Sequence, residues 1–216
     1  LKKFILIYCS EGFLEVEIDG TKFVIPSKHL ITITSGQFHK CFPVTSGKGL
    51  ILRFTYDFFC KNDNDIELIF ENGLFCHFDR NEVIDVSNQP HIQPYLESIE
   101  EELQNQPYQH LISIHSKIAL ILVSINRAKI EHGDEIWKPN ALFLKFLELI
   151  RAEFQHNQPV KYYAEKLTTT EAKLNELSKL HTGKTAQNVV FSLTVSEAKR
   201  LLRYYDLSVK EIAFQL

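Results

Sequence analysis

The chain has 216 residues, of which 44% are hydrophobic and 24% are charged, and its formal net charge is −3. This composition is that of a soluble globular protein with one or two domains, and it excludes a disordered or fibrous chain. The longest apolar stretch, residues 118–125, is too short to cross a bilayer, so we expect no membrane partner. No secretory leader is visible and the 4 cysteines form no CxxC pair, which favours reduced thiols in the cytoplasm.

The charge is unevenly distributed along the chain. Residues 1–139 carry 13 Lys/Arg and 19 Asp/Glu, whereas residues 140–216 carry 11 and 8. A mildly basic C-terminal part fits a nucleic-acid-binding module joined to another domain. Ordinary scatter of surface charge explains the same asymmetry equally well.

The first 55 residues predict short β-strands. The segment Phe13–Ile18 alternates apolar and acidic side chains, and Asp19-Gly20 is a typical two-residue hairpin turn. Other apolar or alternating segments, separated by turn residues, are residues 4–8, 23–25, 30–33 and 49–55. Several short strands of this kind indicate an antiparallel barrel or sandwich. For residues 61–90 we expect irregular structure with one more strand, in which Asn72-Gly73 turns before residues 74–78.

Two helices are expected next. Tyr95, Ile99 and Leu103 recur every four residues, which is typical of an amphipathic helix. A second helix, residues 110–130, has a wide apolar face made of Leu111, Ile114, Ile118, Ile121, Leu122 and Ile125. This face packs on the strands, on the preceding helix or on a second subunit, and the sequence leaves these alternatives open. We expect His115 on the surface.

Residues 131–140 are charged, contain glycine and proline and lack periodicity, so they predict a linker, followed by a helix over 141–155. Residues 160–167, VKYYAEKL, predict a short helix. A polar corner leads into a second helix with Leu174, Leu177 and Leu180 on one side. This pattern is typical of a helix-turn-helix. Either Thr168, in a capping box with Glu171, or Thr170 caps the second helix.

The first helix of this motif recurs. Residues 209–216 read VKEIAFQL against VKYYAEKL at 160–167, and Ser208 with Glu211 forms a further capping box. The repeat suggests a second copy of the unit, of which the chain holds the first helix.

The same residues resemble a known family. Residues from about 143 to 216 resemble the DNA-binding region of AraC/XylS-type transcriptional regulators, through LHTGKTA at 180–186 and EAKRLLRYYDLSVKEIAFQL at 197–216. In that family the sequence continues with Gly-Phe and a second recognition helix. Residues 11–39 resemble the cupin-like sensor barrel that precedes this region. The resemblance implies an α+β fold: a cupin-like antiparallel β-barrel with a helical hairpin (1–131), a linker (132–140) and an all-α helix-turn-helix domain (141–216).

The resemblance also implies which side chains reach DNA. The second helix would enter the major groove and present Ala172, Lys173, Asn175, Glu176 and Lys179. An asparagine can pair with adenine, and a glutamate can accept from cytosine N4. The residues expected at phosphates are Thr170, Lys173, Lys179, Lys184 and Thr185. Arg200 and Arg203, on a linker helix over about 190–205, are expected to stabilise that helix or the interface between the two halves.

The N-terminal part predicts a binding pocket rather than a metal centre. Metal-dependent cupins use two closely spaced histidines and a glutamate, whereas His39 is followed by Lys40 and Cys41. We therefore expect no metal, no cofactor and no enzyme activity. Phe13, His39 and Arg53 are the candidates for an effector pocket.

The sequence thus favours a DNA-binding transcriptional regulator whose barrel senses a small molecule, dimerises, or both. Its expected partners are double-stranded DNA, an effector, a second copy of the chain and RNA polymerase. The alternatives are a protein-interaction module without an effector and a cupin enzyme, which would require clustered His and Glu ligands.

Overall fold

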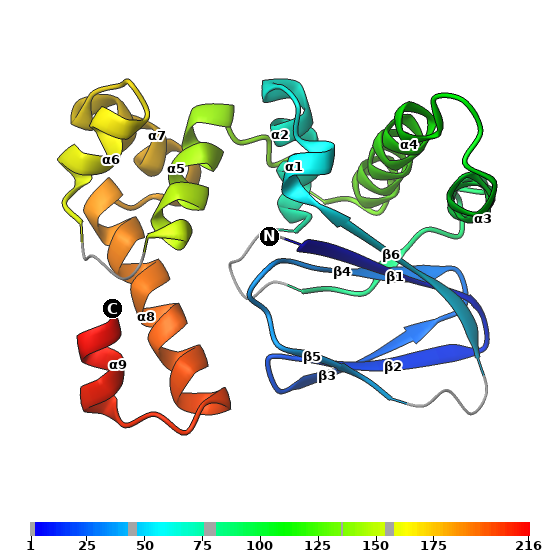
Figure 1. Cartoon of the computed structure of the whole chain (residues 1–216), viewed down its shortest axis with the longest axis horizontal. Helices are drawn as coiled ribbons and strands as arrows, with labels where there is room; N and C mark the ends of the chain where they lie inside the picture. Colours follow the sequence, from blue (N-terminus) through cyan, green and yellow to red (C-terminus); the bar gives the residue numbers. More distant parts are fainter. Residues whose placement is uncertain (1–2, 43–46, 76–80, 135, 154–157) are drawn as a thin grey trace. The chain divides into compact units, whose positions relative to one another are not determined.

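The computed structural model describes residues 3–42, 47–75, 81–134, 136–153 and 158–216. It is a mixed α+β structure of antiparallel sheets and helices (Figure 1). The chain divides into two compact units, Leu1–Lys138 and Pro139–Leu216. The sensing and DNA-binding roles of these units remain predictions.

The first unit contains the strands. Their bounds are β1 (Lys3–Glu11), β2 (Phe13–Ile18), β3 (Thr21–Pro26), β4 (His29–Ile33), β5 (His39–Cys41), β6 (Lys48–Thr55) and β7 (Ile84–Asp85). The predicted hairpin turn is confirmed, because Ile18 pairs with Thr21 and both intervening residues, Asp19 and Gly20, have positive φ.

Among the described residues, these strands form two antiparallel sheets, in the orders β6-β1-β4-β7 and β3-β2-β5. The two sheets share one apolar core of Ile5, Ile7, Cys9, Val16, Ile18, Ile25, Ile31 and Ile33. β5 has only three residues and pairs with β2, while β6 pairs with β1, so no ladder in the described part joins β5 to β6. The described strands therefore form a two-sheet sandwich rather than the closed barrel that the resemblance implies.

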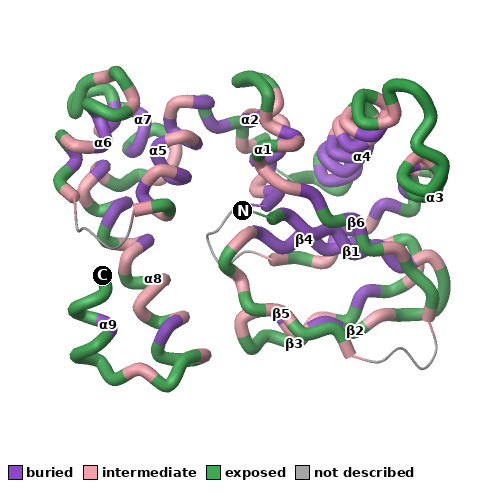
Figure 2. Tube along the Cα trace, viewed as in Figure 1, coloured by how far each residue is buried: buried purple, intermediate pink, exposed green. Residues whose placement is uncertain are grey.

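Helices cover the outer face of the four-stranded sheet (Figure 1). They are α1 (Tyr56–Phe59), α2 (Asp63–Phe70), the 3₁₀ turn η1 (Glu71–Gly73), α3 (Ile92–Asn105) and α4 (His110–Glu131). A second core lies between them and the sheet, with Phe4 of β1 in ring contact with Phe54, Phe70 and Phe75. β1 is consequently buried on both faces, as the burial colouring shows (Figure 2).

The expectation of irregular structure over residues 61–90 is wrong in part. Asn62 accepts a hydrogen bond from the Asp65 N–H at 3.0 Å and so caps α2. Ile66, Ile69 and Phe70 then bury one helical face. The expected extra strand, β7, has two residues, and residues 76–80 lie outside the described part of the chain.

The wide apolar face of α4 packs inside the first unit. Ile114, Ile118, Ile121, Leu122 and Ile125 are all buried, whereas Leu111 is 54% exposed. By length and composition α4 alone among the described helices could cross a membrane, but its buried face marks it as a core helix.

Two sequence expectations for these helices need correction. His115 is half-buried rather than a free surface side chain: its Nε2–H donates to the Phe59 carbonyl at 2.9 Å and its ring stacks on Phe59 with 4.9 Å between centroids. Of the predicted stripe on α3, Ile99 is buried, Tyr95 is half-buried and Leu103 is 55% exposed; the buried face is instead completed by Ile92 and Leu96.

The second unit is helical in its described residues. Its helices are α5 (Ala141–Ala152), α6 (Val160–Lys166), α7 (Glu171–Thr182), α8 (Ala186–Tyr204) and α9 (Val209–Gln215). α8 begins earlier than residue 190, where the linker helix was predicted, because the Thr185 hydroxyl caps it by accepting the Asn188 N–H. The predicted capping box of Ser208 and Glu211 is confirmed.

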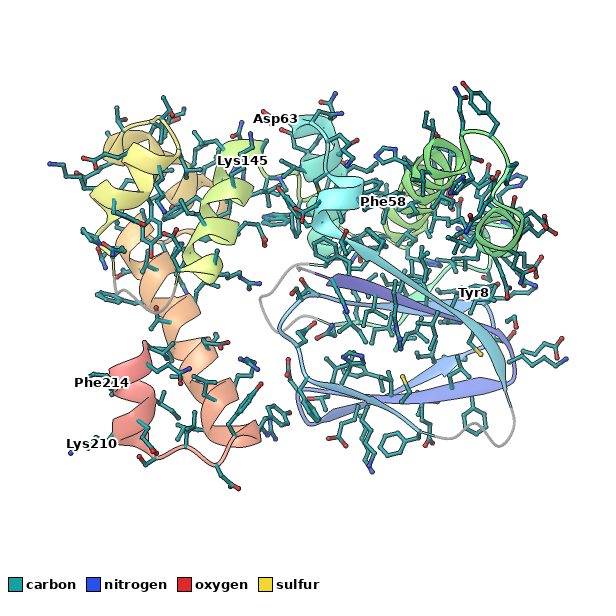
Figure 3. The ribbon with its side chains drawn as sticks, in the orientation of Figure 1. Tyr8, Phe58, Asp63, Lys145, Lys210 and Phe214 are labelled. Carbon is teal, nitrogen blue, oxygen red and sulfur yellow. The ribbon has the colours of Figure 1, made fainter. Side chains whose placement is uncertain are left out.

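The two repeated helices differ in burial. In α6, Val160, Tyr163 and Ala164 are buried, whereas in α9 the equivalent of Tyr163, Ile212, is buried and Val209 is 70% exposed. The side chains of Lys210 and Phe214 project from α9 (Figure 3). Although α6 and α9 have similar sequences, their side chains are therefore buried to different extents.

Candidate nucleic-acid interface

The corner between α6 and α7 is closed by backbone hydrogen bonds. The Thr168 N–H donates to the Glu165 carbonyl at 3.1 Å, and the Thr169 N–H donates to the Ala164 carbonyl at 2.9 Å. Thr168 adopts a left-handed φ of +53°, which reverses the chain direction. The small side chain of Ala164 is buried, as expected where two helices approach closely.

Both ends of α7 are fixed by local groups. The Thr170 hydroxyl accepts the Lys173 N–H at 3.1 Å, so Thr170 rather than Thr168 is the N-cap. At the other end Gly183 adopts a φ of +70° and its N–H donates to the Lys179 carbonyl at 2.9 Å. These caps set the length of the predicted recognition helix.

One face of α7 is buried and the opposite face is exposed. Leu174, Leu177 and Ser178 face the core of the second unit. The exposed arc consists of Ala172, Lys173, Glu176, Lys179 and Leu180. Leu180 was predicted to share the buried side, but it is 71% exposed. A step of six residues from Leu174 turns the helix by about 600°, which leaves Leu180 about 120° away from the Leu174 direction.

The exposed arc is polar at its centre. Glu176 lies between Lys173 and Lys179, and Lys173 Nζ is 2.8 Å from Glu176 Oε1. Both side chains are about half exposed, so this ion pair contributes little stability and can exchange for other partners. The arc therefore offers two cations and one carboxylate to a ligand.

Asn175 is engaged within the second unit. Its Oδ1 accepts the Ala186 N–H at 2.9 Å, at the first residue of α8. An adenine contact would use the same oxygen to accept from N6. Asn175 therefore links α7 to α8, and an adenine contact, which stays a prediction, would have to share this oxygen.

The remaining predicted residues lie where α7 meets α8. Lys184 Nζ is 3.1 Å from Ser192 Oγ, and the Thr185 hydroxyl accepts the Asn188 N–H at 3.3 Å. The hydroxyls of Thr170 and Thr185 both accept from the backbone, and each retains its own O–H for donation to a phosphate oxygen.

His181 is a residue that the sequence reasoning missed. It follows Leu174 by seven residues and so lies on the buried face of α7. The Asn140 N–H donates to His181 Nε2 at 3.2 Å, and the ring lies 5.0 Å from that of Phe143. Burial lowers the pKa of His181 below its ordinary value.

Two of the three effector-pocket candidates face the core between the sheets of the first unit. Arg53 pairs with Ile5 across β6 and β1, and His39 pairs with Ile18 across β5 and β2, so both lie on the same side of their sheets as core residues. Arg53 is nevertheless exposed and His39 is half-buried, so they lie at the edge of this core. Phe13 does not, because strand alternation turns it away from the side occupied by Val16, and it is 42% exposed. Phe13 therefore leaves the candidate set. Among the described residues, no group of three or more His, Cys, Asp or Glu side chains is placed to hold a metal ion.

Neither a protein-family model nor a curated protein matches the chain. The solved structures similar to it include the AraC-like transcriptional activator CuxR, with 12% identity, a TM-score of 0.41, and coverage of 95% of this chain and 68% of that one. They also include ToxT from Vibrio cholerae strain SCE256 bound to an unsaturated fatty acid, with 11% identity, a TM-score of 0.40, and coverage of 99% and 77%. ToxT from Vibrio cholerae O395 has 12% identity, a TM-score of 0.42, and coverage of 98% and 78%. Similarities this low carry no conclusion, so function is inferred from the chain's own residues.

Proposed function

We propose that the chain is part of a sequence-specific DNA-binding transcriptional regulator of the AraC/XylS type. In this proposal residues 141–216 bind double-stranded DNA, while residues 1–131 sense a small molecule, dimerise, or both. The regulator acts in the cytoplasm, together with RNA polymerase. The observation that carries the proposal is α7, whose buried face fixes it to its unit and whose opposite face exposes Lys173, Glu176 and Lys179.

An exposed helix of this kind fits the major groove of B-DNA. The groove admits an α-helix, and side chains at its centre reach base edges while side chains at its flanks reach phosphates. Glu176 occupies the centre of the arc and can accept from cytosine N4 once its pair with Lys173 has been exchanged. Lys173 and Lys179 lie on the two flanks and suit the phosphates of the two strands.

The test is the salt dependence of DNA affinity. Replacing Lys173 and Lys179 together by alanine removes two phosphate contacts, so the slope of log K against log salt should decrease by about 2, and affinity should fall to a similar extent for all sequences. Fluorescence anisotropy with a labelled duplex pool at several salt concentrations measures both quantities.

The matched control is the double change of Lys22 and Lys40 to alanine. These lysines lie in the first unit, in β3 and β5, so the net charge changes equally while α7 stays intact. The control should keep the salt slope of the unmodified chain. If both double variants change the slope alike, the effect is one of net charge and α7 is not the contact surface.

We further propose that the effector is a small molecule with a carboxylate group. Arg53 and His39 lie on the inner sides of opposing sheets, Arg53 exposed and His39 half-buried, and both side chains carry N–H groups that suit a carboxylate. A panel of small acids should contain a compound that raises the melting temperature of the first unit, because ligand binding stabilises the native state. Arg53→Ala should abolish that shift, and an unchanged shift would remove Arg53 from the site.

A further inference from the structure

Asn72 joins three separate segments of the first unit. Its backbone N–H donates to the Trp137 carbonyl at 2.8 Å, and its Oδ1 accepts the Trp137 N–H at 2.9 Å. Its Nδ2 donates to Asn126 Oδ1 at 3.1 Å, in the C-terminal part of α4. Asn72 is only 6% exposed and adopts a left-handed φ of +51°. One buried amide thus ties η1, α4 and the segment that follows α4.

The segment after α4 has a second attachment nearer the helix. The Asp134 N–H donates to the Lys129 carbonyl at 3.1 Å, and Lys129 Nζ is 3.3 Å from Asp134 Oδ2. Lys129 is buried and is also ion-paired with Glu82. Within the predicted linker, Asp134 and Trp137 are therefore both attached to the first unit.

The second unit begins with an attachment of its own. The Asn140 N–H donates to His181 Nε2 at 3.2 Å, and the Asn140 side chain caps α5. Only Lys138 and Pro139 lie between Trp137, which is bound in the first unit, and Asn140, which is bound in the second. Pro139 stiffens this connection further, because its ring fixes φ.

We propose that Asn72 is a latch that holds Trp137 on the first unit and thereby sets how many residues connect this point to the second unit. With the latch closed, only Lys138 and Pro139 lie between the two attached residues, Trp137 and Asn140. With the latch open, Lys129 still holds Asp134, so residues 135–139 connect the two attached points. A displacement of α4 or η1, by an effector or a second subunit, would act directly on Asn72.

The latch can open without unfolding the unit. The attachments of this part of the chain include the hydrogen bonds of Asn72 to Trp137 and of Lys129 to Asp134, while Ile136 is 65% exposed and Gly133 has a φ of +95°. Segments with few buried apolar contacts open at low free-energy cost compared with core elements. In a regulator, the reach of the DNA-binding unit decides which arrangements of half-sites it can occupy. The effect of the latch on DNA binding rests on the proposed function, whereas the contacts of Asn72 do not depend on it.

Trp137 provides the test, because the chain contains 1 tryptophan. Asn72→Gly keeps the left-handed backbone and removes the side-chain acceptor and donor. In this variant the Trp137 amide should exchange about tenfold faster than in the unmodified chain, as expected for a lost hydrogen bond. Its emission should shift to longer wavelength. Lys138→Ala is the control, since it changes an exposed neighbour and should leave exchange and emission unchanged.

Two results would overturn the latch. One is an Asn72→Gly chain that is folded and whose Trp137 amide exchanges at the unmodified rate. The other needs no variant and therefore holds even if Asn72→Gly fails to fold: a Trp137 amide that exchanges without protection in the unmodified chain. Neither measurement involves DNA. If the Trp137 amide is protected but the chain does not bind DNA, the latch proposal holds and the proposed function is wrong.

Discussion

Thr168 occupies an unfavourable backbone conformation at the corner of the helix-turn-helix. Its φ is +53° although it is β-branched, and its side chain is exposed. A Cβ atom in the left-handed region lies too close to the following carbonyl oxygen, which costs about 1–2 kcal/mol. The strain is retained because the Glu165 and Ala164 carbonyls hold the corner closed.

Replacing Thr168 by glycine should therefore stabilise the second unit. We expect its free energy of unfolding to rise by about 1 kcal/mol, because glycine adopts this φ without strain. Hydrogen exchange of the α6 and α7 amides in the full chain measures the change. Thr169→Gly is the matched control: its φ is negative, so glycine there should lower the free energy by roughly 0.5–1 kcal/mol. Destabilisation by Thr168→Gly would show that the threonine side chain is needed.

His181 makes the stability of the second unit depend on pH. Burial lowers its pKa, and its Nε2 must be unprotonated to accept the Asn140 N–H. A group with a lowered pKa in the folded state binds protons preferentially when unfolded, so this contribution is complete above the ordinary value of about 6.5 and is lost as the pH falls below it. Exchange protection of the α7 amides should decrease between pH 7.5 and 5.5. His181→Asn should flatten this dependence, and an equally steep decrease in that variant would assign it to another group.

At the scale of elements, α4 has two faces with different roles. Its inner face, which includes Ile118 and Ile121, is buried in the first unit, and Ile121 is 0% exposed. On its outer face Ile112 is 62% exposed and Leu120 is 46% exposed. If a second copy packs on this helix, it does so through the outer face.

Two adjacent substitutions separate these roles. Leu120→Glu should leave the first unit folded and, if the outer face dimerises, give a monomer by sedimentation. Ile121→Glu places an unpaired carboxyl group in the core and should lower the free energy of unfolding by more than about 3 kcal/mol. Circular dichroism checks the fold in both cases. A Leu120→Glu chain that sediments as a dimer would exclude the outer face of α4 as the interface.

Local signals in the sequence predicted local structure well. The Asp19-Gly20 hairpin and the cap at Ser208 depend on neighbouring residues, and the structure confirms both. α2 was missed because its N-terminal half is polar and resembles a loop. The environments of His115 and Asn72 were missed because their partners are 56 and 65 positions away in the chain. Such contacts arise only from the tertiary fold.

Helical periodicity predicted most of the exposed arc of α7. It did not predict the exposure and the hydrogen-bond partners of individual side chains. Leu180 was misplaced because a spacing of three residues drifts around the helix. Asn175 looked like a base contact from its position, but its oxygen is held by the first N–H of α8. The sequence cannot show which polar side chains are already engaged within the protein.

At the scale of the whole molecule, the two units differ in the sign of their net charge. The first unit carries 13 Lys/Arg and 19 Asp/Glu, and the second carries 11 and 8. A net positive unit attracts DNA through its phosphates, and a net negative unit is repelled by them. The proposed division of roles therefore predicts that DNA contacts are confined to the second unit.

Mapping the contact surface by NMR tests this account most directly. A duplex titrated into the isotopically labelled full chain at low salt should shift the amide signals of α7 and of the first turn of α8. The signals of β2, β3 and β5 should stay in place. Shifts centred on those strands, or no shifts from a folded chain at low salt, would contradict the proposal that α7 binds DNA.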